Sequence, residues 1–293
     1  LCGWFTQPRL RWWAGGALAA LAAAWLAQWQ IGRAATRLTI LPLNGGEAVF
    51  FSGRQSDGGW LMDCGNAASV QFVTRPFLAA QGVNRLRRLV LTHGDVRHVG
   101  GGLRLVEVFP VREVLVSPVR FRSPSYREFS ARFAGMPGKL RHVRRGDQLG
   151  PWTVLHPADE KPFPQADDNA LVLRGDFAGT RILLLSDLGK PGQNALMQSG
   201  ADVRADIVVS GLPTQGEPLA DDLLRAINPK VIVVNDAEYP ATARAGPALR
   251  ARLLRQRTRV IYTREAGAVT VELRGKEWRV SAMRGGTLRG GSP

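Results

Sequence analysis

The sequence predicts an α/β fold that is preceded by a long apolar helix. Short apolar runs, such as 89–91 and 181–185, alternate along the chain with amphipathic segments of helical period. Residues 12–32 carry no charged side chain. With 293 residues, of which 45% are apolar, the chain is long enough for one sizeable domain and an appendage.

The apolar run at residues 12–32 predicts a transmembrane helix. At about 1.5 Å per residue it would span a hydrocarbon layer of about 30 Å. Tryptophans lie near both of its ends and arginines flank it, which suits the two membrane interfaces. A signal peptide and a buried helix of a soluble domain remain alternatives, because the run is rich in alanine. The chain begins with Leu1 instead of Met, so we interpret residues 1–11 as the N-terminal remnant of a longer chain.

The remaining chain predicts one domain over residues 37–281 and a disordered, glycine-rich tail over 282–293. Strands are expected at 38–43, 48–52, 60–63, 89–91, 111–116, 152–156, 170–174, 181–185, 206–209, 230–235, 259–263, 268–273 and 278–281. Helices are expected at 70–81, 191–199, 219–227 and 247–256, and a helix or turn at 100–108.

The loop after the strand at 89–91 holds a group of potential metal ligands. His93, Asp95 and His98 lie within six residues of one another, and two of the four histidines of the chain are here. Loops at strand ends commonly carry the chemistry of α/β folds. Two imidazoles and a carboxylate at this spacing can converge on one cation.

This loop resembles the metal motif of the metallo-β-lactamase superfamily, and more narrowly that of ComEC-type competence proteins. Thr-His-x-Asp-x-x-His-x-Gly-Gly carries the resemblance at residues 92–101. Further family-like motifs follow the same order along the chain: Leu-Asn-Gly-Gly-Glu-Ala at 43–48, Leu-Met-Asp-Cys-Gly at 61–65, Asp-Asp-Asn-Ala-Leu-Val at 167–172 and Leu-Leu-Leu-Ser-Asp at 183–187. The resemblance implies a four-layer αβ/βα sandwich.

The resemblance also implies a metal site, from which this chain departs. The implied metal ligands are His93, Asp95, His98 and Asp187, of which Asp95 and Asp187 are the expected catalytic residues. Arg97 stands where the family has the aspartate of the second metal, and Thr214 and Gln215 stand where it has two histidines. Because a guanidinium stays protonated and repels a cation, we expect at most one weakly bound Zn or Mn ion, or none. The expected substrate-binding residues are Arg97, Thr214, Gln215, Asp168 and Glu47.

The function implied by the resemblance is DNA handling during uptake across the bacterial inner membrane, with the domain on its outer face and with other parts of a DNA channel as partners. The formal charge of +15 favours binding to single-stranded DNA or to an anionic membrane. The basic segment 120–145 is either a surface that binds phosphate groups or only a solvated helix face. We expect hydrolysis to be weakened or lost. An active single-metal phosphodiesterase or nuclease and a non-catalytic docking domain are the alternatives.

Overall fold

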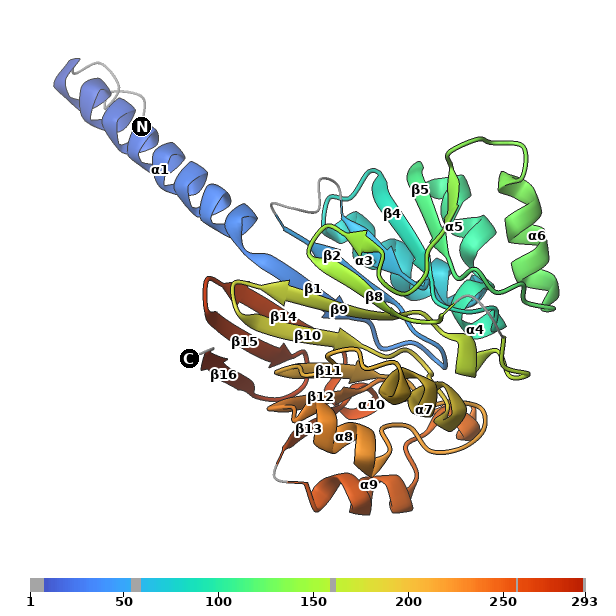
Figure 1. The fold of residues 1–293 in the computed structure, drawn as a ribbon. Helices are drawn as coiled ribbons and strands as arrows, with labels where there is room; N and C mark the ends of the chain where they lie inside the picture. Colours follow the sequence, from blue (N-terminus) through green and yellow to red (C-terminus); the bar gives the residue numbers. More distant parts are fainter. Residues whose placement is uncertain (1–7, 54–58, 159–161, 257, 292–293) are drawn as a thin grey trace.

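The computed structural model describes residues 8–53, 59–158, 162–256 and 258–291, which form two mixed β-sheets and the helices around them (Figure 1). The first sheet has the order β16 (Thr287–Gly291), β15 (Glu277–Ala282), β14 (Val269–Arg274), β1 (Thr36–Ile40), β2 (Val49–Ser52), β3 (Trp60–Met62), β4 (Leu86–Leu91), β5 (Val111–Val116) and β6 (Leu140–His142). The second has the order β13 (Arg259–Tyr262), β12 (Val231–Val234), β11 (Ile207–Ser210), β10 (Thr180–Leu184), β9 (Val172–Phe177), β8 (Trp152–His156) and β7 (Gln148–Leu149).

The helices lie mainly on the outer faces of the two sheets. Over the first sheet are α2 (Ala67–Ser69), the π-helical turn η2 (Val70–Thr74), α3 (Arg75–Ala80), α4 (Val96–Val99), α5 (Gly102–Val108) and α6 (Pro124–Phe133). Over the second are α7 (Lys190–Gln198), α8 (Asp221–Ile227) and α9 (Pro247–Leu254). The short elements η3 (Asp167–Asn169), η4 (Ala241–Ala243) and α10 (Thr263–Ala266) connect strands.

Three apolar clusters separate four layers. One lies between the two sheets, and its centre is an aromatic group in which the rings of Phe51, Trp152 and Phe177 lie 5.3–5.6 Å apart, centroid to centroid. The second lies between the first sheet and its helices, and the third between the second sheet and its helices. Fully burying a large apolar side chain contributes roughly 1.5–3 kcal/mol, so the sandwich core dominates the stability. The expected αβ/βα sandwich is confirmed.

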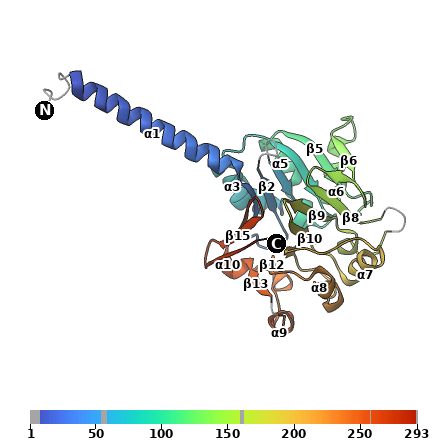
Figure 2. The ribbon, with the colours of Figure 1, turned by 60° about the vertical axis from the view of Figure 1, so that its left-hand side comes forward.

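The segment with the predicted transmembrane helix lies in α1 (Pro8–Ala34), which projects away from the sandwich (Figures 1 and 2). Residues 12–26 are all exposed, including Trp12, Trp13 and Trp25. In the described part of the chain, no helix combines the length and the apolarity that crossing a membrane requires.

The C-terminal residues differ from the expectation of a disordered tail over 282–293. Thr287–Gly291 form β16, which pairs antiparallel with β15. Leu288 lies opposite Val280 and packs against the inter-sheet core, and this apolar contact gives the glycine-rich segment a fixed register.

The basic segment 120–145 contains α6, which the sequence analysis did not assign as a helix. Ser123 caps the helix by accepting a hydrogen bond from the Tyr126 N–H, at 3.1 Å. The aromatic residues that are interleaved with the arginines, Phe121, Tyr126 and Phe129, are buried in the core of the first sheet. They stabilise the helix against the sheet and do not form an exposed stacking surface.

We expect Glu113 to stabilise the first sheet in a pH-dependent way. Its carboxylate accepts hydrogen bonds from Arg88 Nε at 2.6 Å and Arg141 Nε at 2.9 Å. Burial raises the pKa of Glu113, but the two guanidinium groups outweigh burial and lower it below its usual value. A lowered folded-state pKa stabilises the protein above the unfolded-state pKa, and this stabilisation is lost as the pH falls through the folded-state value.

Glu113→Gln should therefore lower the free energy of unfolding by about 1 kcal/mol at pH 7, a value discounted for partial exposure. Denaturant unfolding at several pH values measures the difference from the native chain, which should shrink as the pH falls through the lowered folded-state pKa of Glu113. Glu217→Gln is the control, since the Glu217 side chain is 64% exposed and lies 3.4 Å from Arg252. A difference for Glu113→Gln that does not change with pH would contradict the assignment.

Candidate functional site

A cluster of buried polar residues lies at one end of the sandwich, where loops from both sheets meet. Thr92 and His93 follow β4, and His98 lies in the next helix, α4. Asp63 follows β3 of the same sheet, whereas Ser186 and Asp187 lie in the loop after β10 of the second sheet. These side chains are almost completely buried. Asp63 and Ser186 have φ values of 55° and 51°, in the left-handed region that such residues rarely adopt. Backbone strain of this kind commonly marks a functional site.

His98 is held between carboxylates from the two sheets. Its Nδ1 lies 2.8 Å from Asp63 Oδ2, and its Nε2 lies 3.0 Å from Asp187 Oδ2. Burial alone would lower the pKa of His98, but the charges and hydrogen bonds of Asp187 and Asp63 raise it well above its usual value. Without a metal ion, His98 is therefore an imidazolium that donates a hydrogen bond from each nitrogen.

Thr92 joins the remaining groups of the cluster. Its N–H and its hydroxyl group both donate to the Asp63 carboxylate, at 2.8 and 2.6 Å. Thr92 Oγ1 also lies 2.9 Å from Ser186 Oγ and 3.0 Å from His93 Nδ1. Asp63 thus accepts bonds from both Thr92 and His98, and this network fixes the positions of the two histidines.

The Nε2 atom of His93 is buried and makes no hydrogen bond within the described residues. Its nearest ionic partner is Asp167 Oδ1, at 3.4 Å. The rings of His93 and His98 lie 4.2 Å apart, centroid to centroid. Burial would raise the pKa of Asp167, but the contacts with His93 and Thr214 outweigh it and lower the pKa to about 2. An imidazole nitrogen that makes no hydrogen bond with the described residues, 3.4 Å from a carboxylate and close to a second imidazole, is suited to bind a cation.

Arg97 lies at the mouth of the cluster. Its Nε is 3.2 Å from Asp95 Oδ1, and its Nη2 donates a hydrogen bond to Thr214 Oγ1 at 3.1 Å. Arg97 and Asp187 line the same small cavity, of about 10 Å³, at the Gly45-Gly46 turn. The guanidinium therefore supplies positive charge next to Asp187, on the side of the cluster where the sequence analysis expected a missing metal.

Asp95 does not join the two histidines, although the sequence predicts it as a metal ligand and catalytic residue. It is the N-cap of α4 and accepts a hydrogen bond from the Arg97 N–H at 2.7 Å. Burial raises the pKa of Asp95, but the hydrogen bonds and the charge of Arg97 lower it below its usual value. The nearby guanidinium and the capping bond explain why this carboxylate is turned to Arg97.

Glu47 is completely buried, and its carboxylate oxygens have no hydrogen-bond partner among the described residues. Burial, together with the nearby charge of Asp63, raises the pKa of Glu47 to about 8. The Glu47 side chain is therefore mostly protonated at neutral pH. Potential ligand atoms of Glu47, Asp63 and His98 lie within 4.8 Å of one another, so Glu47 borders the cluster on the side of the first sheet.

Two further predicted residues lie apart from the histidines. Asp168 lies in η3, and its buried side chain packs against Gly189, the residue before α7. Burial raises the pKa of Asp168. Gln215 lies on an exposed loop, whereas the neighbouring Thr214 contacts Arg97. Of the expected metal ligands, the structure brings His93, His98 and Asp187 together, with potential ligand atoms within 4.8 Å of one another.

The sequence analysis missed four residues of the cluster, namely Thr92, Asp63, Asp167 and Ser186. Each belongs to a motif that carries the resemblance, and each follows or ends a strand or begins a turn. Their position in these motifs was the available signal. Their role depends on contacts between segments that are far apart in the sequence, such as the contact of Thr92 with Ser186.

The donor set fits one metal ion better than a pair. His93, His98 and Asp187 form a two-imidazole, one-carboxylate group, which is typical of a catalytic zinc site with an open position. A cation there would have to displace the proton of His98 Nε2. Arg97 and Thr214, which the resemblance aligns with ligands of a second metal, bond to each other and offer no anionic or imidazole ligand.

The family model of the metallo-β-lactamase superfamily matches residues 51–211, and the chain belongs to this superfamily. Within it, the chain is related to competence proteins. It is 26% identical over 251 residues to ComE operon protein 3 of Bacillus subtilis (strain 168), and 26% identical over 218 residues to competence protein ComA of Neisseria gonorrhoeae. The alignments cover 78% and 71% of this chain, but only 32% and 28% of the relatives. The chain thus spans about a third of their length.

Solved structures share the fold at low sequence identity. The metallo-β-lactamase fold protein YhfI from Bacillus subtilis has a TM-score of 0.52 and 13% identity, over 82% of this chain and 100% of that chain. A mutant of CmlA beta-hydroxylase has a TM-score of 0.50 and 16% identity, over 81% of this chain and 54% of that chain. At these identities, the two similarities show a shared fold and nothing more.

We expect the Gly45-Gly46 turn to hold Arg97 in place. Both glycines have φ values of +78°, but a Cβ on Gly46 would collide with the backbone carbonyl group of Arg97, whereas a Cβ on Gly45 would meet Pro240 Cδ at 3.3 Å. Gly46→Ala should therefore lower the free energy of unfolding by about 2–4 kcal/mol. Gly45→Ala is the matched control and should cost about 1 kcal/mol, because it has the same backbone strain but meets only side-chain atoms of Pro240 and Arg97, at 3.3 and 3.4 Å. Equal losses in denaturant unfolding would show that the turn does not pack on Arg97 as described.

Proposed function

We propose that this chain is the metallo-β-lactamase-fold domain of a ComEC-like DNA-uptake protein, that it contacts DNA during internalisation, and that its hydrolytic activity is weakened or lost. The names of the two related competence proteins support the DNA-uptake context. In this proposal the domain belongs to a larger protein of the bacterial inner membrane, faces outward, and has single-stranded DNA and other parts of a DNA channel as partners.

The observation that carries the proposal is the position of Arg97. Its guanidinium bonds to Asp95 and Thr214 and shares a small cavity with Asp187. Two-metal hydrolysis of a phosphodiester requires a closely spaced pair of cations that stabilise the attacking and the leaving oxygen. A fixed guanidinium can neutralise phosphate charge, but it cannot lower the pKa of an attacking water by coordinating it, as a metal ion would.

The residues of the site suggest how a phosphate group would be bound. The Arg97 side chain is 17% exposed and retains N–H donors beyond those used by Asp95 and Thr214. The exposed Thr214 hydroxyl lies beside it. A phosphodiester at the mouth of the cluster would therefore meet a guanidinium and a hydroxyl group. Behind them, the bonds of His98 with Asp63 and Asp187 hold α4, which carries Arg97, in place.

One metal ion would fit behind this mouth, and this fit favours a second candidate function. An ion bound by His93, His98 and Asp187 would supply a Lewis acid for a single-metal phosphodiesterase or nuclease. Asp63, Asp95, Asp167 and Asp187 contribute four carboxylates, against the two cationic groups of Arg97 and His98. The cluster therefore has an excess of negative charge that a divalent cation would neutralise.

Metal content and nuclease activity of the purified chain test the proposal. We expect no more than one Zn²⁺ or Mn²⁺ ion per chain by mass spectrometry of the metals, and no cleavage of single-stranded DNA with either ion. Two bound ions and robust cleavage would overturn the proposal. With one ion and measurable cleavage, His93→Ala and Asp187→Ala separate the two candidates, because an enzyme would lose turnover whereas a binding domain would keep its DNA affinity.

Substituting Arg97 tests its effect on metal binding directly. Arg97→Asp should raise the affinity for Zn²⁺ or Mn²⁺ by about tenfold or more in calorimetric titration, because a repelling charge becomes a carboxylate ligand. Arg97→Gln is the control that removes the charge without supplying a ligand, and it should have a smaller effect. If neither variant binds metal more tightly than the native chain, Arg97 does not limit metal binding.

A further inference from the structure

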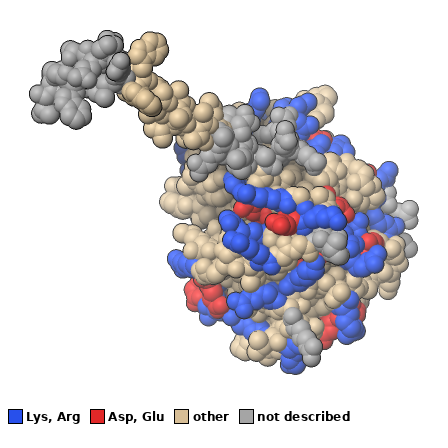
Figure 3. Space-filling model, turned by 90° about the vertical axis from the view of Figure 1, so that its left-hand side faces the viewer, with Lys and Arg blue, Asp and Glu red and all other residues tan. Residues whose placement is uncertain are grey.

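A row of charged side chains crosses the outer face of four neighbouring strands of the first sheet. Arg37 on β1 lies opposite Glu272 on β14, Glu272 lies opposite Arg279 on β15, and Arg279 lies opposite Arg289 on β16. Figure 3 shows bands of Lys and Arg side chains on this side of the molecule, with smaller patches of Asp and Glu between and beside them. Because strands are about 4.8 Å apart, the four residues form a line of about 14 Å across the sheet.

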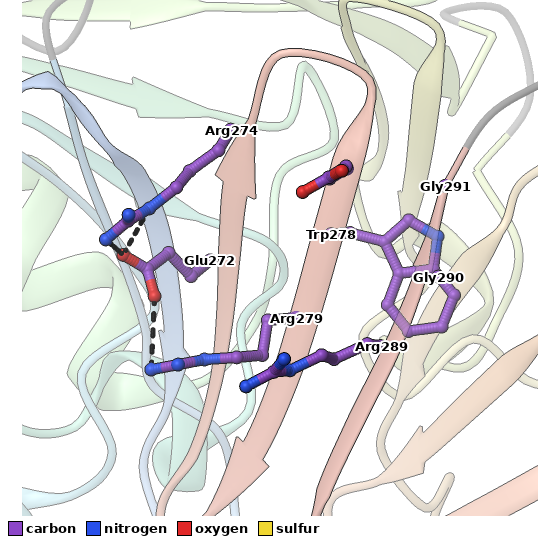
Figure 4. A pocket seen from close by; sticks show the side chains of 8 residues that line it. Glu272, Arg274, Trp278, Arg279, Arg289, Gly290 and Gly291 are labelled. Carbon is purple, nitrogen blue, oxygen red and sulfur yellow. Dashed lines mark hydrogen bonds and ion pairs between the residues drawn. The ribbon is translucent and has the colours of Figure 1, made fainter.

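Glu272 organises the arginines of this row. It lies within 3.5 Å of Arg37, 2.8 Å of Arg274 and 3.3 Å of Arg279, and Figure 4 shows the guanidinium groups of Arg274 and Arg279 converging on its carboxylate. Each guanidinium has five N–H donors, and one carboxylate has about four acceptor positions. Most donors of the three arginines therefore remain available to an external anion. We call Arg37, Glu272, Arg274, Arg279 and Arg289 the arginine face.

Arg289 adds a positive charge without a partner. It makes no ion pair with any described residue, it is exposed, and Figure 4 shows its side chain beside that of Arg279. A hollow of about 600 Å³ opens here, and Arg274, Arg279, Arg289 and Glu272 are among the residues that line it. The carboxylates of Glu272 and Glu277 also line the hollow, and Glu272 already pairs with Arg279, so Arg289 is the guanidinium that remains for an external anion.

A row of hydroxyl groups runs parallel to the charged row. Thr39 lies opposite Thr270, Thr270 opposite Ser281, and Ser281 opposite Thr287. These residues are two positions along each strand from the charged ones, so they share the same face of the sheet. Arginine and hydroxyl side chains are the groups that most often contact phosphate and sugar oxygens in nucleic-acid complexes.

We propose that the arginine face binds the phosphodiester backbone of a nucleic-acid strand, at a surface separate from the histidine cluster. This inference rests on the proposed function in so far as DNA is the nucleic acid concerned. A line of arginines that the carboxylate of Glu272 interrupts, along a hollow, suits a chain of phosphates better than a flat membrane surface, which contacts protruding cations. The two ends of β1 lead to different places. Arg37 lies near its start, and the turn that follows its end contains Gly46, which packs on Arg97 of the candidate site. The arginine face therefore lies at the opposite end of the sheet from the candidate site.

The test compares two charge-matched double variants in fluorescence-anisotropy titrations of a labelled single strand and of its duplex. Arg279→Gln with Arg289→Gln removes two charges from the arginine face. Arg85→Gln with Arg112→Gln removes two charges from another basic hollow, lined by Arg85, Arg87, Arg112 and Lys139. We expect the first variant to bind single-stranded DNA about tenfold or more weakly, with the salt slope of log K reduced by about 1.4, and the control to stay within about threefold of the native chain.

The outcomes separate the inference from the proposed function. If the native chain binds DNA and both double variants lose affinity equally, or if only Arg97 variants lose it, the DNA-handling function stands and the arginine face is not the binding surface. If the native chain does not bind DNA, both fail. Vesicles of phosphatidylcholine with and without phosphatidylglycerol form the second arm. Binding to the anionic vesicles that needs Arg279 and Arg289, without DNA binding, would assign the face to a membrane and overturn the inference.

Metal titration of the same variant controls for folding. Because the arginine face is remote from His93 and Asp187, the Arg279→Gln, Arg289→Gln variant should bind metal ions as the native chain does. A changed metal affinity would mean that the substitutions alter the sandwich as a whole. In that case the double variant Arg279→Lys, Arg289→Lys decides whether the arginine face binds DNA. This pair keeps the charges and should retain most of the DNA affinity if the inference holds.

Discussion

His98 bridges two carboxylates that belong to different sheets, and the polar end of the sandwich depends on this bridge. Asp63 follows β3 of the first sheet, and Asp187 follows β10 of the second. The Thr92–Ser186 hydrogen bond and the bond from the Leu171 N–H to the Thr92 carbonyl group join the sheets at the same end. Breaking one partner of a fully buried charge pair typically costs about 3–5 kcal/mol. The bridge therefore fixes the geometry in which Arg97 faces Asp187.

Under the proposed function, this arrangement would let the fold keep a metal-type cluster without a second metal position. A buried group of carboxylates needs positive charge, which metal ions or protonated side chains can supply. Here the imidazolium of His98 and the guanidinium of Arg97 supply it, and a cation bound by His93, His98 and Asp187 would replace the proton of His98 Nε2. Charge is thus balanced in part by side chains, whose position does not depend on the availability of an ion.

The periodicity of the sequence predicted an α/β fold, and the resemblance carried by the order of its motifs implied the sandwich and part of the cluster. It brought His93, His98 and Asp187 to one site but assigned Asp95 to the same site, since spacing alone cannot show that a carboxylate caps α4 and pairs with Arg97. The role of Asp63 and Asp167 depends on contacts between distant segments, which a single sequence does not reveal. The pairing of β16 was missed for the same reason, because glycine-rich composition hid the contact of Leu288 with the core.

Diffraction from crystals grown with excess Mn²⁺, recorded at a wavelength where manganese scatters anomalously, tests most directly whether Arg97 has replaced a metal ion. The account predicts one anomalous peak, or none, among His93, His98 and Asp187, with the Arg97 guanidinium still bonded to Asp95 and Thr214. Two peaks bridged by Asp187, with the guanidinium turned out to solvent, would contradict it.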